Sequence, residues 1–424
     1  MLDIKFIRQN QKIVQEACKN KNVLLDIEDI LNLDKKNKDL LDKVENLRCQ
    51  KNKLGKDDVS EARKIKMHIK ELEPMLKEVE DLLETLMLQV PNIPMEDVPL
   101  GKDDTENQKI KEWGEPTKFD FEAKDHVALG EKLDILDIKR ASKVAGSRFG
   151  YLKGGLALLE MALIQYSFEV LTSPEIIKKL ANSIDKNYSD KVFVPVIPPV
   201  MIRPEVFTRM ARLSPKNKEE RYHLAQDDLY LIGSAEHTLG SMHMDETILE
   251  DQFPIRYVGF STSFRREAGS YGKDTRGIFR VHQFDKIEME VFSLSENSLK
   301  EHKLLVAIQE YLMQSLKIPY RVMMVCTGDM GKPDARQIDI EAWFPGQNKY
   351  RETHSADLMT DYQSRRLKTK VKRKNGSELV HMNDATAFAI GRTLIAIMEN
   401  YQQEDGSILV PDVLKKYVNF EKIS

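Results

Sequence analysis

The first ninety residues carry a hydrophobic repeat with the spacing of a coiled coil. Apolar residues follow one another in steps of three and four over residues 30–54, and the stepping resumes over residues 65–90. Such a repeat is typical of helices that pack along one seam. The intervening Leu54-Gly55-Lys56-Asp57-Asp58 favours a turn. The sequence therefore predicts an antiparallel helical hairpin over about residues 28–90, whose second helix is bent or loosened at Pro74.

The segment after the hairpin changes character. Pro91-Asn92-Ile93-Pro94 ends the helix, because two prolines in four residues cannot continue it. A polar and charge-rich linker follows over about residues 101–120. Helical patterning is then expected around residues 126–136 and again over residues 154–171, with a short glycine-punctuated strand at residues 145–150 between them.

From about residue 190 onward, short β-prone runs alternate with turns. Segment 172–191 before them is interpreted as an irregular or helical insertion, and helices are expected over residues 298–316 and 386–401. Strands that follow one another by hairpins, with helices set apart, predict an α+β domain around a mainly antiparallel sheet flanked by helices. The expected domains are residues 1–100, with the helical arm, and residues 101–424. The β-prone runs are residues 191–200, 230–233, 256–264, 277–291, 320–326 and 337–344.

Composition and charge narrow the function classes. A chain of 424 residues with 41% hydrophobic residues can bury a sizeable core. Its net charge of -3 excludes a protein that coats nucleic acid through bulk charge, so any such contact must be local. Cys18, Cys49 and Cys326 lie far apart, which argues against a disulfide framework or a cysteine-rich zinc site and favours the cytoplasm. A secretory signal or a membrane-spanning run of about 18 apolar residues is not found.

Two arginine-bearing segments are the candidates for chemistry. The sequence contains no GxxxxGK[ST], no GxGxxG and no HExxH motif, so it does not support P-loop, Rossmann or zincin chemistry. The segment from Phe264 to Glu288 places several arginines across a glycine-rich hairpin, where guanidinium forks suit phosphate oxygens. A salt-bridged surface loop is the alternative. The second segment, residues 387–394, is an expected apolar helix with Arg392 inside it, either snorkelling outward or facing an anion.

The same two segments resemble a known family. Phe264-Arg265-Arg266-Glu267 resembles motif 2 of class II aminoacyl-tRNA synthetases, and Ala389-Ile390-Gly391-Arg392-Thr393-Leu394 resembles their motif 3. The finer match is to the seryl-tRNA synthetase family, and it covers essentially the whole chain, including the N-terminal hairpin. It rests on the ordered set REAGSYGKDTRGIFRVHQFDKIEME, CTGDMG, YRETHSADLMTDYQSRR and GRTLIAIMENYQ.

The resemblance implies an ATP site. Arg265 would hold the α-phosphate, Glu267 would read the adenine amino group and Phe284 would stack on the ring. Arg392 and Arg276 would hold the γ-phosphate end of a bent ATP. Arg265 and Arg392 are the implied catalytic residues. The full implied set for ATP is Arg265, Arg266, Glu267, Arg276, Val281, Phe284, Glu352, Ser355 and Arg392.

A magnesium ion and a two-step reaction are implied as well. Glu352 and Ser355 resemble the pair that holds magnesium between phosphates, and hard oxygen ligands suit that ion. The serine carboxylate would attack the α-phosphate and expel pyrophosphate, after which the acyl group would pass to the 3′-terminal adenosine of tRNA. Positioning and charge neutralisation would supply most of the acceleration, without a general base.

The implied serine pocket departs from the family pattern at two places. Glu288 would accept a hydrogen bond from the serine hydroxyl and Glu236 would pair with its amino group, so that alanine, which lacks the hydroxyl, would leave Glu288 unpaired. The family commonly has Thr-x-Glu where this chain has Ser234-Ala235-Glu236, and Asn-Gly-Ser-Gly where it has Asp384-Ala385-Thr386-Ala387. Asp384 thereby replaces a neutral amide with a carboxylate. The implied serine set is Ser234, Ala235, Glu236, Arg265, Glu288 and Thr386.

The resemblance also implies partners. The helical arm would reach the long variable arm of serine tRNA, and selenocysteine tRNA is left open as a second substrate. Residues 368–374 would either touch the acceptor end or form an exposed hairpin. Residues 194–199 resemble motif 1, which lies at the homodimer interface in the family. Two other functions stay open. One is an enzyme that delivers an activated amino acid to a carrier protein, and the other is a catalytically idle RNA-binding or coiled-coil protein.

Overall fold

The computed structural model describes residues 1–55, 58–214, 217–268, 274 and 276–424. Their contacts separate the chain into two compact units. The first comprises Met1–Pro94 together with Gly331–Pro333, and the second comprises Met95–Met330 together with Asp334–Ser424. Three residues from late in the sequence therefore belong to the N-terminal unit.

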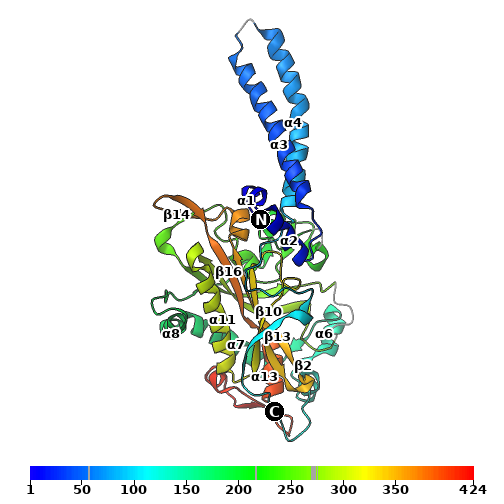
Figure 1. Cartoon of the computed structure of the whole chain (residues 1–424). Coiled ribbons are helices and arrows are strands. Elements are labelled where there is room, and N and C mark those ends of the chain that lie inside the picture. Colours follow the sequence, from blue (N-terminus) through cyan, green and yellow to red (C-terminus); the bar gives the residue numbers. More distant parts are fainter. Residues whose placement is uncertain (56–57, 215–216, 269–273, 275) are drawn as a thin grey trace. The chain divides into compact units, whose positions relative to one another are not determined.

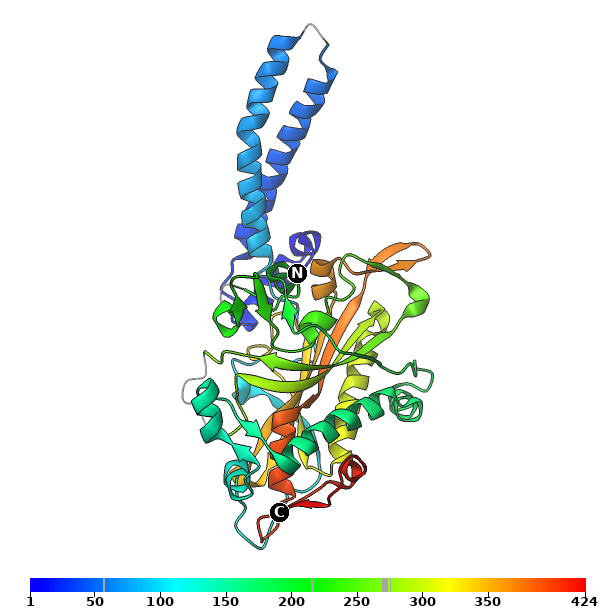
Figure 2. The same cartoon turned by 180° about the vertical axis from the view of Figure 1, so that it is seen from behind.

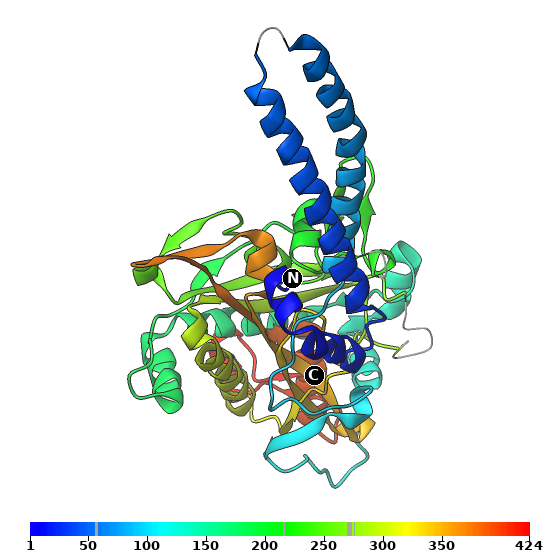
Figure 3. The same ribbon diagram turned by 45° about the horizontal axis from the view of Figure 1, so that its top comes forward.

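The N-terminal unit is helical. Helices α3 and α4 run antiparallel and contact each other along their length (Figure 1, Figure 3). Leu40 and Val44 of α3 pack with Leu76 and Val79 of α4, as the seven-residue repeat predicts, and α4 continues through Pro74 as one helix. The helical hairpin is confirmed, although residues 56–57 of its expected turn lie outside the described residues. The helices are α1 (Ile4–Gln9), α2 (Gln11–Asn20), α3 (Ile27–Lys53) and α4 (Val59–Met87).

The second unit is built on an eight-stranded sheet. Its strand order is β1-β11-β12-β13-β16-β10-β9-β4, and every neighbouring pair is antiparallel except β4 and β9. The α+β fold with a mainly antiparallel sheet is thus confirmed. The strands are β1 (Gln108–Trp113), β4 (Val194–Val196), β9 (Ile255–Phe264), β10 (Gln283–Ser293), β11 (Tyr320–Met324), β12 (Arg336–Phe344), β13 (Lys349–Thr360) and β16 (His381–Ala389).

Alternation along β10 gives this sheet two unlike faces. Ile287 and Met289 point into the hydrophobic core. Lys286, Glu288 and Glu290 occupy the intervening positions, and successive side chains of a strand point to opposite faces. One face of the sheet is therefore apolar and covered by helices, while the other carries the charged groups described below.

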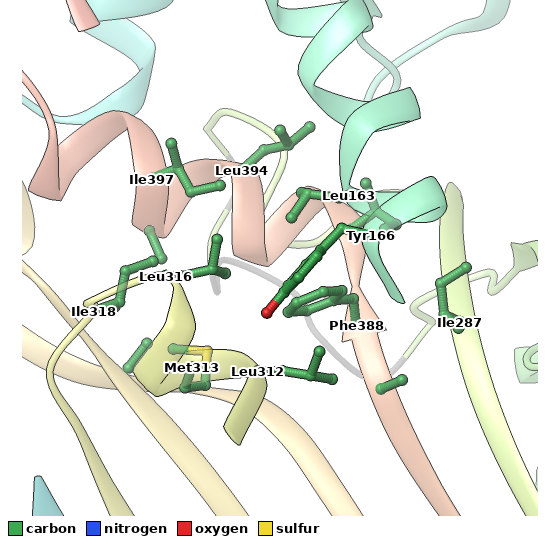
Figure 4. Packing of buried hydrophobic residues seen from close by; sticks show 14 of the residues in the cluster. Leu163, Tyr166, Ile287, Leu312, Met313, Leu316, Ile318, Phe388, Leu394 and Ile397 are labelled. Atoms are coloured by element: carbon green, nitrogen blue, oxygen red, sulfur yellow. The ribbon is translucent and has the colours of Figure 1, made fainter. Parts of the chain in front are cut away.

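Three helices cover the apolar face, and a fourth packs on two of them. Helices α7 (Gly154–Thr172), α11 (Ser298–Ser315) and α13 (Ile390–Asn400) contact sheet strands, and α8 (Pro174–Ile184) packs on α7 and α11 (Figure 2). Figure 4 shows Tyr166 of α7, Leu312 of α11, Phe388 of β16 and Leu394 of α13 gathered in one cluster. Burial of this apolar surface is the main force that stabilises the unit.

Helix α7 has the length and composition of a helix that could cross a membrane, and among the described residues it alone does. Glu160 and Glu169 interrupt its apolar run, which is why a search for uninterrupted apolar stretches passes over it. Eight of its residues are buried, and its core-facing side chains belong to the main hydrophobic cluster. Inside a folded domain, a buried core helix commonly has this composition.

Two expected elements are wrong at their boundaries. Residues 386–389 were expected in a helix but form the end of β16, and the helix begins only at Ile390. This stretch is apolar and buried between neighbouring strands, so periodicity does not separate strand from helix there. Residues 145–150 do not form the expected strand. Helix α6 (Ile138–Ala145) ends at Gly146, whose φ of 98° suits glycine, and strand β3 follows at Tyr151–Leu152.

Other expected runs are shorter than predicted. The helix expected over residues 126–136 ends at Lys132, the strand expected from residue 277 begins at Gln283, and segment 172–191 contains α8. The remaining elements are α5 (His126–Lys132), α9 (Pro204–Arg209), α10 (Glu236–Leu239), α12 (Tyr362–Leu367), β2 (Leu136–Asp137), β5 (Met201–Ile202), β6 (His223–Leu224), β7 (Leu229–Leu231), β8 (Thr247–Leu249), β14 (Lys370–Arg373), β15 (Gly376–Leu379), β17 (Ile408–Leu409) and β18 (Lys422–Ile423).

Candidate active site

A pocket opens on the charged face of the eight-stranded sheet. Strands β10, β13 and β16, the start of α13 and the segment that connects β9 to β10 supply most of its wall. Seven residues of the expected ATP set line it: Arg265, Glu267, Val281, Phe284, Glu352, Ser355 and Arg392. Separate parts of the sequence thus meet at one site.

Arg265 stands where β9 ends. Its backbone N–H donates to the carbonyl of His282 at 3.0 Å, which continues the pairing of β9 with β10. Its side-chain Nε donates to the carbonyl of Gly233 at 3.1 Å, and the guanidinium lies 5.2 Å from the centre of the Phe284 ring. The Arg265 cation is therefore held in place beside an aromatic face.

Glu267 lies two residues further on and forms an ion pair with Arg280, with 2.6 Å between Oε2 and Nη1. Its φ of 53° falls in the left-handed region, where a residue other than glycine is uncommon. Residues 269–273 and 275 of the same hairpin lie outside the described residues. The arrangement gives the pocket a second fixed cation, Arg280, which the sequence analysis did not single out.

Arg392 lies in the first turn of α13 and faces Glu352. Its Nη1 donates to the Glu352 carbonyl at 3.0 Å and lies 3.2 Å from Glu352 Oε2, while its guanidinium lies 4.5 Å from the centre of the Phe279 ring. Removal from water opposes ionisation of Glu352, but Arg392, with Arg265 and Lys286, outweighs it and holds the pKa of this carboxyl below its usual range. Glu352 is therefore an anion at neutral pH.

Oxygen ligands gather next to Glu352. Ser355 lies opposite Asp339 across the β12–β13 pair, and its hydroxyl donates to Asp357 Oδ1 at 3.0 Å. Burial, followed by the charge of Glu352, raises the pKa of Asp339 well above its usual value. A divalent cation would relieve this crowding of acidic groups, so Glu352 and Ser355 fit a magnesium ion by the nature of their oxygen donors.

The other end of the pocket is more deeply buried. The Ser234 hydroxyl donates to Glu288 Oε2 at 2.7 Å, and Lys286 Nζ donates to the same hydroxyl at 3.2 Å and pairs with Glu288. Burial raises the pKa of Glu288, and Lys286 opposes that rise. Ser234, Ala235 and Glu288 lie behind the lining residues, whereas Glu236 and Thr386 form part of the wall.

An unexpected arginine reaches this end. Arg212, which follows α9, places its Nε 2.8 Å from Glu236 Oε1, and its Nη2 donates to Asp384 Oδ2 at 3.2 Å. Asp357 Oδ2 lies 3.9 Å from the same Nη2. Burial opposes ionisation of Glu236, yet Arg212, together with His237 and Lys286, outweighs it and holds the pKa of that carboxyl well below its usual value. Glu236 is consequently ionised although it is buried.

Three acids lie in one row beneath Arg212. Asp384 on β16 pairs in register with Glu290 on β10 and with Asp357 on β13. Like charges directly opposite each other in a sheet are destabilising. Burial chiefly, and the neighbouring carboxylates next, raise the pKa of all three well above their usual values. These groups retain protons far more readily than Glu236 does.

The two histidines beside the site are neutral. Burial lowers the pKa of His237 to about 3 and the pKa of His354 to about 4. Glu236 opposes the shift in His237 without cancelling it. Neither ring carries a charge at neutral pH, and both are buried behind the pocket.

The structure does not bring every expected residue to the pocket. Arg266 is exposed beside the Tyr222 ring, and Arg276 is exposed, so neither lines the wall. Sequence reasoning missed several lining residues. For Lys286, the alternation of polar and apolar residues along β10 was an available signal. Arg280 lies within the arginine-bearing segment from Phe264 to Glu288 but was given no role of its own, whereas the local sequence does not mark the other three; the missed residues are Arg212, Arg280, Lys286, Gln337 and Asp357.

Two family models match the chain. The seryl-tRNA synthetase N-terminal domain matches residues 1–94, and the tRNA synthetase class II core domain (G, H, P, S and T) matches residues 220–401. The first match covers the helical hairpin. The second covers six of the eight sheet strands, all except β1 and β4, and every residue that lines the pocket except Arg212.

Full-length relatives agree with these models. Serine–tRNA ligases of Thermodesulfovibrio yellowstonii and Symbiobacterium thermophilum are 40% and 41% identical, and each alignment covers 100% of both chains. A seryl-tRNA synthetase from Pyrococcus horikoshii complexed with ATP has a TM-score of 0.88 at 36% identity, covering 100% of this chain and 99% of its own. The cytoplasmic enzyme of Naegleria fowleri in complex with AMP has a TM-score of 0.86 at 31% identity, with the same coverage. The chain therefore belongs to the seryl-tRNA synthetase family and is a serine–tRNA ligase.

Proposed function

We propose that the pocket on the charged face of the sheet binds ATP and serine side by side, and that both steps of ligation take place in it. The observation that carries this proposal is the convergence of Arg265, Phe284, Glu352 and Arg392 on one wall. Phe284, Glu352 and Arg392 come from β10, β13 and α13, and Arg265 directly follows β9. A structural protein has no use for such a set of charges around an open cavity.

ATP takes the end of the pocket that holds Phe284. The adenine ring stacks on Phe284, Glu267 accepts a hydrogen bond from the adenine amino group, and Arg265 holds the α-phosphate. Arg392 meets the γ-phosphate end. The ATP found with the Pyrococcus horikoshii relative supports this assignment. The proposed ATP set is completed by Val281 in the wall and by Arg266 and Arg276. These two arginines are exposed and would contact the nucleotide from the rim of the pocket.

Serine takes the buried end. Glu236 is ionised and pairs with the serine ammonium, while Thr386 in the wall, backed by Glu288 and Ser234, receives the side-chain hydroxyl. Ala235 supports the neighbouring backbone. A pocket that offers polar partners to a hydroxyl leaves them unpaired when alanine enters, which is the stronger form of discrimination.

The chemistry asks mainly for positioning. A carboxylate oxygen of serine forms the new bond to the α-phosphorus as the bond to pyrophosphate breaks. A ribose hydroxyl of the 3′-terminal adenosine of tRNA then takes the acyl group as AMP leaves. Glu352 and Ser355 would hold magnesium, which supplies charge neutralisation of the phosphates when bound. Arg265 and Arg392 stabilise the charge that develops on the phosphate oxygens, and the neutral His237 and His354 take no part.

Pyrophosphate exchange without tRNA tests the pocket directly. The full chain is assayed with ATP and magnesium and with serine, threonine, alanine, glycine or cysteine in turn. Exchange that depends on serine alone supports the assignment. Exchange with another of the five would overturn the serine assignment while leaving the ATP site standing.

The helical arm is the proposed reader of tRNA. Its exposed basic residues lie on a rigid hairpin and suit the backbone of the long variable arm of serine tRNA, with the acceptor end near residues 368–374. Deletion of residues 34–83 is expected to preserve pyrophosphate exchange and to abolish tRNA charging. Undiminished charging by the shortened protein would refute this role.

We also infer a cytoplasmic homodimer. Strand β4 lies at the edge of the sheet, and Val194 and Ile197 beside it are 53% and 87% exposed. A second copy of the chain would cover these apolar groups. Sedimentation equilibrium is expected to give twice the chain mass, and Ile197→Asp is expected to shift the protein towards the monomer.

A further inference from the structure

Arg212 connects parts of the chain that are far apart in sequence. It precedes Asp384 by 172 residues, and its guanidinium reaches both Asp384 and Glu236. The side chain is only 16% exposed, and the two carboxylates are 3% and 11% exposed. A guanidinium fork can meet two carboxylates at once, which a lysine ammonium does less well.

Carboxylates outnumber cations around Arg212. Glu236, Glu288 and Asp384 each place an oxygen within 4.8 Å of the others, and Arg212 and Lys286 are the side-chain cations that pair with them among the described residues. Since these two cations already meet the three carboxylates, the cluster does not need a metal ion. Glu290, fully buried beside Asp384, has no hydrogen-bond partner for either oxygen within the described part of the chain.

We propose that Arg212 is a positioning residue for the amino-acid side of the reaction. Its guanidinium keeps Glu236 ionised and oriented, and it takes up Asp384, so that the serine ammonium meets one available carboxylate. The inference rests on the proposed function, in which Glu236 pairs with that ammonium. Arg212 itself acts through Glu236 and is not assigned contact with the substrate.

Arg212 and Asp384 are thereby a matched pair. The family resemblance leads one to expect a neutral asparagine at position 384, and an asparagine amide could donate to Glu236 without adding charge. Asp384 adds an acid that competes with Glu236 for protons. Arg212 offsets that acid, so replacing either residue alone disturbs Glu236, and replacing both restores a neutral neighbour.

A double-mutant cycle tests the pair. Arg212→Gln, Asp384→Asn and the double variant are compared with the parent in serine-dependent pyrophosphate exchange. We expect Arg212→Gln to raise the serine KM about 30- to 100-fold, because it leaves buried acids without their cation. Asp384→Asn in that background is expected to recover at least about tenfold, while the KM for ATP changes by less than about threefold in all variants.

The control pair is Arg209 and Asp245. Their ion pair, 2.8 Å apart, lies in the same unit outside the pocket wall. Arg209→Gln is expected to leave the serine KM unchanged. Thermal unfolding of each variant separates loss of fold from loss of binding. If Arg212→Gln unfolds, Asp384→Asn remains as a folded single variant for comparison, because the replacement is nearly isosteric. In that event, recovery of a folded and serine-binding double variant supports the pairing.

Glu236→Gln distinguishes the proposed serine site from the proposed role of Arg212. It is expected to raise the serine KM at least about 100-fold, since it removes the charge that meets the ammonium. An unchanged KM in Glu236→Gln would overturn the serine assignment and, with it, the role of Arg212. A second outcome would overturn the role of Arg212 alone. In it, Glu236→Gln raises the serine KM, but the changes in serine KM caused by Arg212→Gln and Asp384→Asn simply multiply in the double variant.

Discussion

Two buried groups of charges in the second unit differ in how their charges are balanced. Arg256 of β9 and Glu301 of α11 form a closed pair in which both side chains are fully buried, with atoms 2.8 and 2.9 Å apart. The carbonyls of Ser189 and Lys191 accept the other guanidinium hydrogens. In the pocket, by contrast, several carboxylates share Arg212, and Glu290 has no partner within the described residues.

The difference separates support from function. Where protein groups balance every charge, the site has nothing left to offer a ligand and serves the fold. Where acids exceed bases beside a cavity, the surplus is available to a substrate cation such as the serine ammonium. The neighbouring acids of the pocket repel one another, and this destabilising repulsion is absent from the closed pair.

The largest expected effect is on catalysis. Arg265→Ala should reduce pyrophosphate exchange at least about a thousandfold, roughly 4 kcal/mol, because the α-phosphate loses its cation. The melting temperature should change by no more than about 2 °C. A variant that keeps its exchange activity would show that the motif 2 assignment is wrong. A variant that unfolds would show that the charges of the pocket support the fold, as those of the closed pair do.

The closed pair should respond in the opposite way. Glu301→Gln leaves the Arg256 guanidinium buried without a counter-ion and should lower the free energy of unfolding by about 3 to 5 kcal/mol in urea titrations. The folded fraction should keep the serine KM of the parent. The apolar double replacement R256M/E301L should recover most of the loss, and failure to recover it would mean that the pair does more than balance its own charges.

Glu290 should show a smaller effect that depends on pH. Burial, and then Asp384, raise its pKa well above the usual value of 4.5, so the folded protein binds a proton that the unfolded chain releases. Stability therefore falls as the pH rises above 4.5 towards the raised pKa. Glu290→Gln should be about 1 kcal/mol more stable than the parent at pH 8, and the difference should vanish near pH 4.5. Equal stability at both values would contradict the shifted pKa.

The smallest effect is expected on the helical arm. Arg48 and Glu73 lie 2.8 Å apart, but their side chains are 56% and 47% exposed. Water and salt screen such a pair. Arg48→Gln should change the free energy of unfolding by less than about 0.5 kcal/mol, and a loss comparable to that of Glu301→Gln would show that exposure does not decide the strength of these pairs.

Local patterns predicted much of this molecule. The seven-residue repeat locates α3 and α4, and the arginines that follow β9 and open α13 point to the pocket. These features depend on neighbours in sequence, or on motifs that stay intact within a short segment. The prediction of the helical hairpin and of the mainly antiparallel sheet is confirmed on that basis.

Long-range placement was beyond such patterns. No local spacing indicates that Arg212 meets Asp384, and Asp384 was noticed only as a departure from a family motif. Residues 386–389 were assigned to a helix because an apolar run buried on both sides has no period. The register of β10, β16 and β13 creates the row of acids, and register is a property of the assembled sheet.

The three residues Gly331–Pro333 set an order of events during synthesis. The Asn92 backbone N–H donates to the carbonyl of Lys332 at 2.8 Å, the Asn92 side chain donates to that of Pro333 at 2.8 Å, and Lys21 Nζ donates to that of Gly331 at 3.0 Å. A ribosome adding roughly 5 to 20 residues per second delivers these acceptors tens of seconds after Pro94 has been made. The N-terminal unit therefore reaches its final hydrogen bonding only when most of the second unit has already left the ribosome.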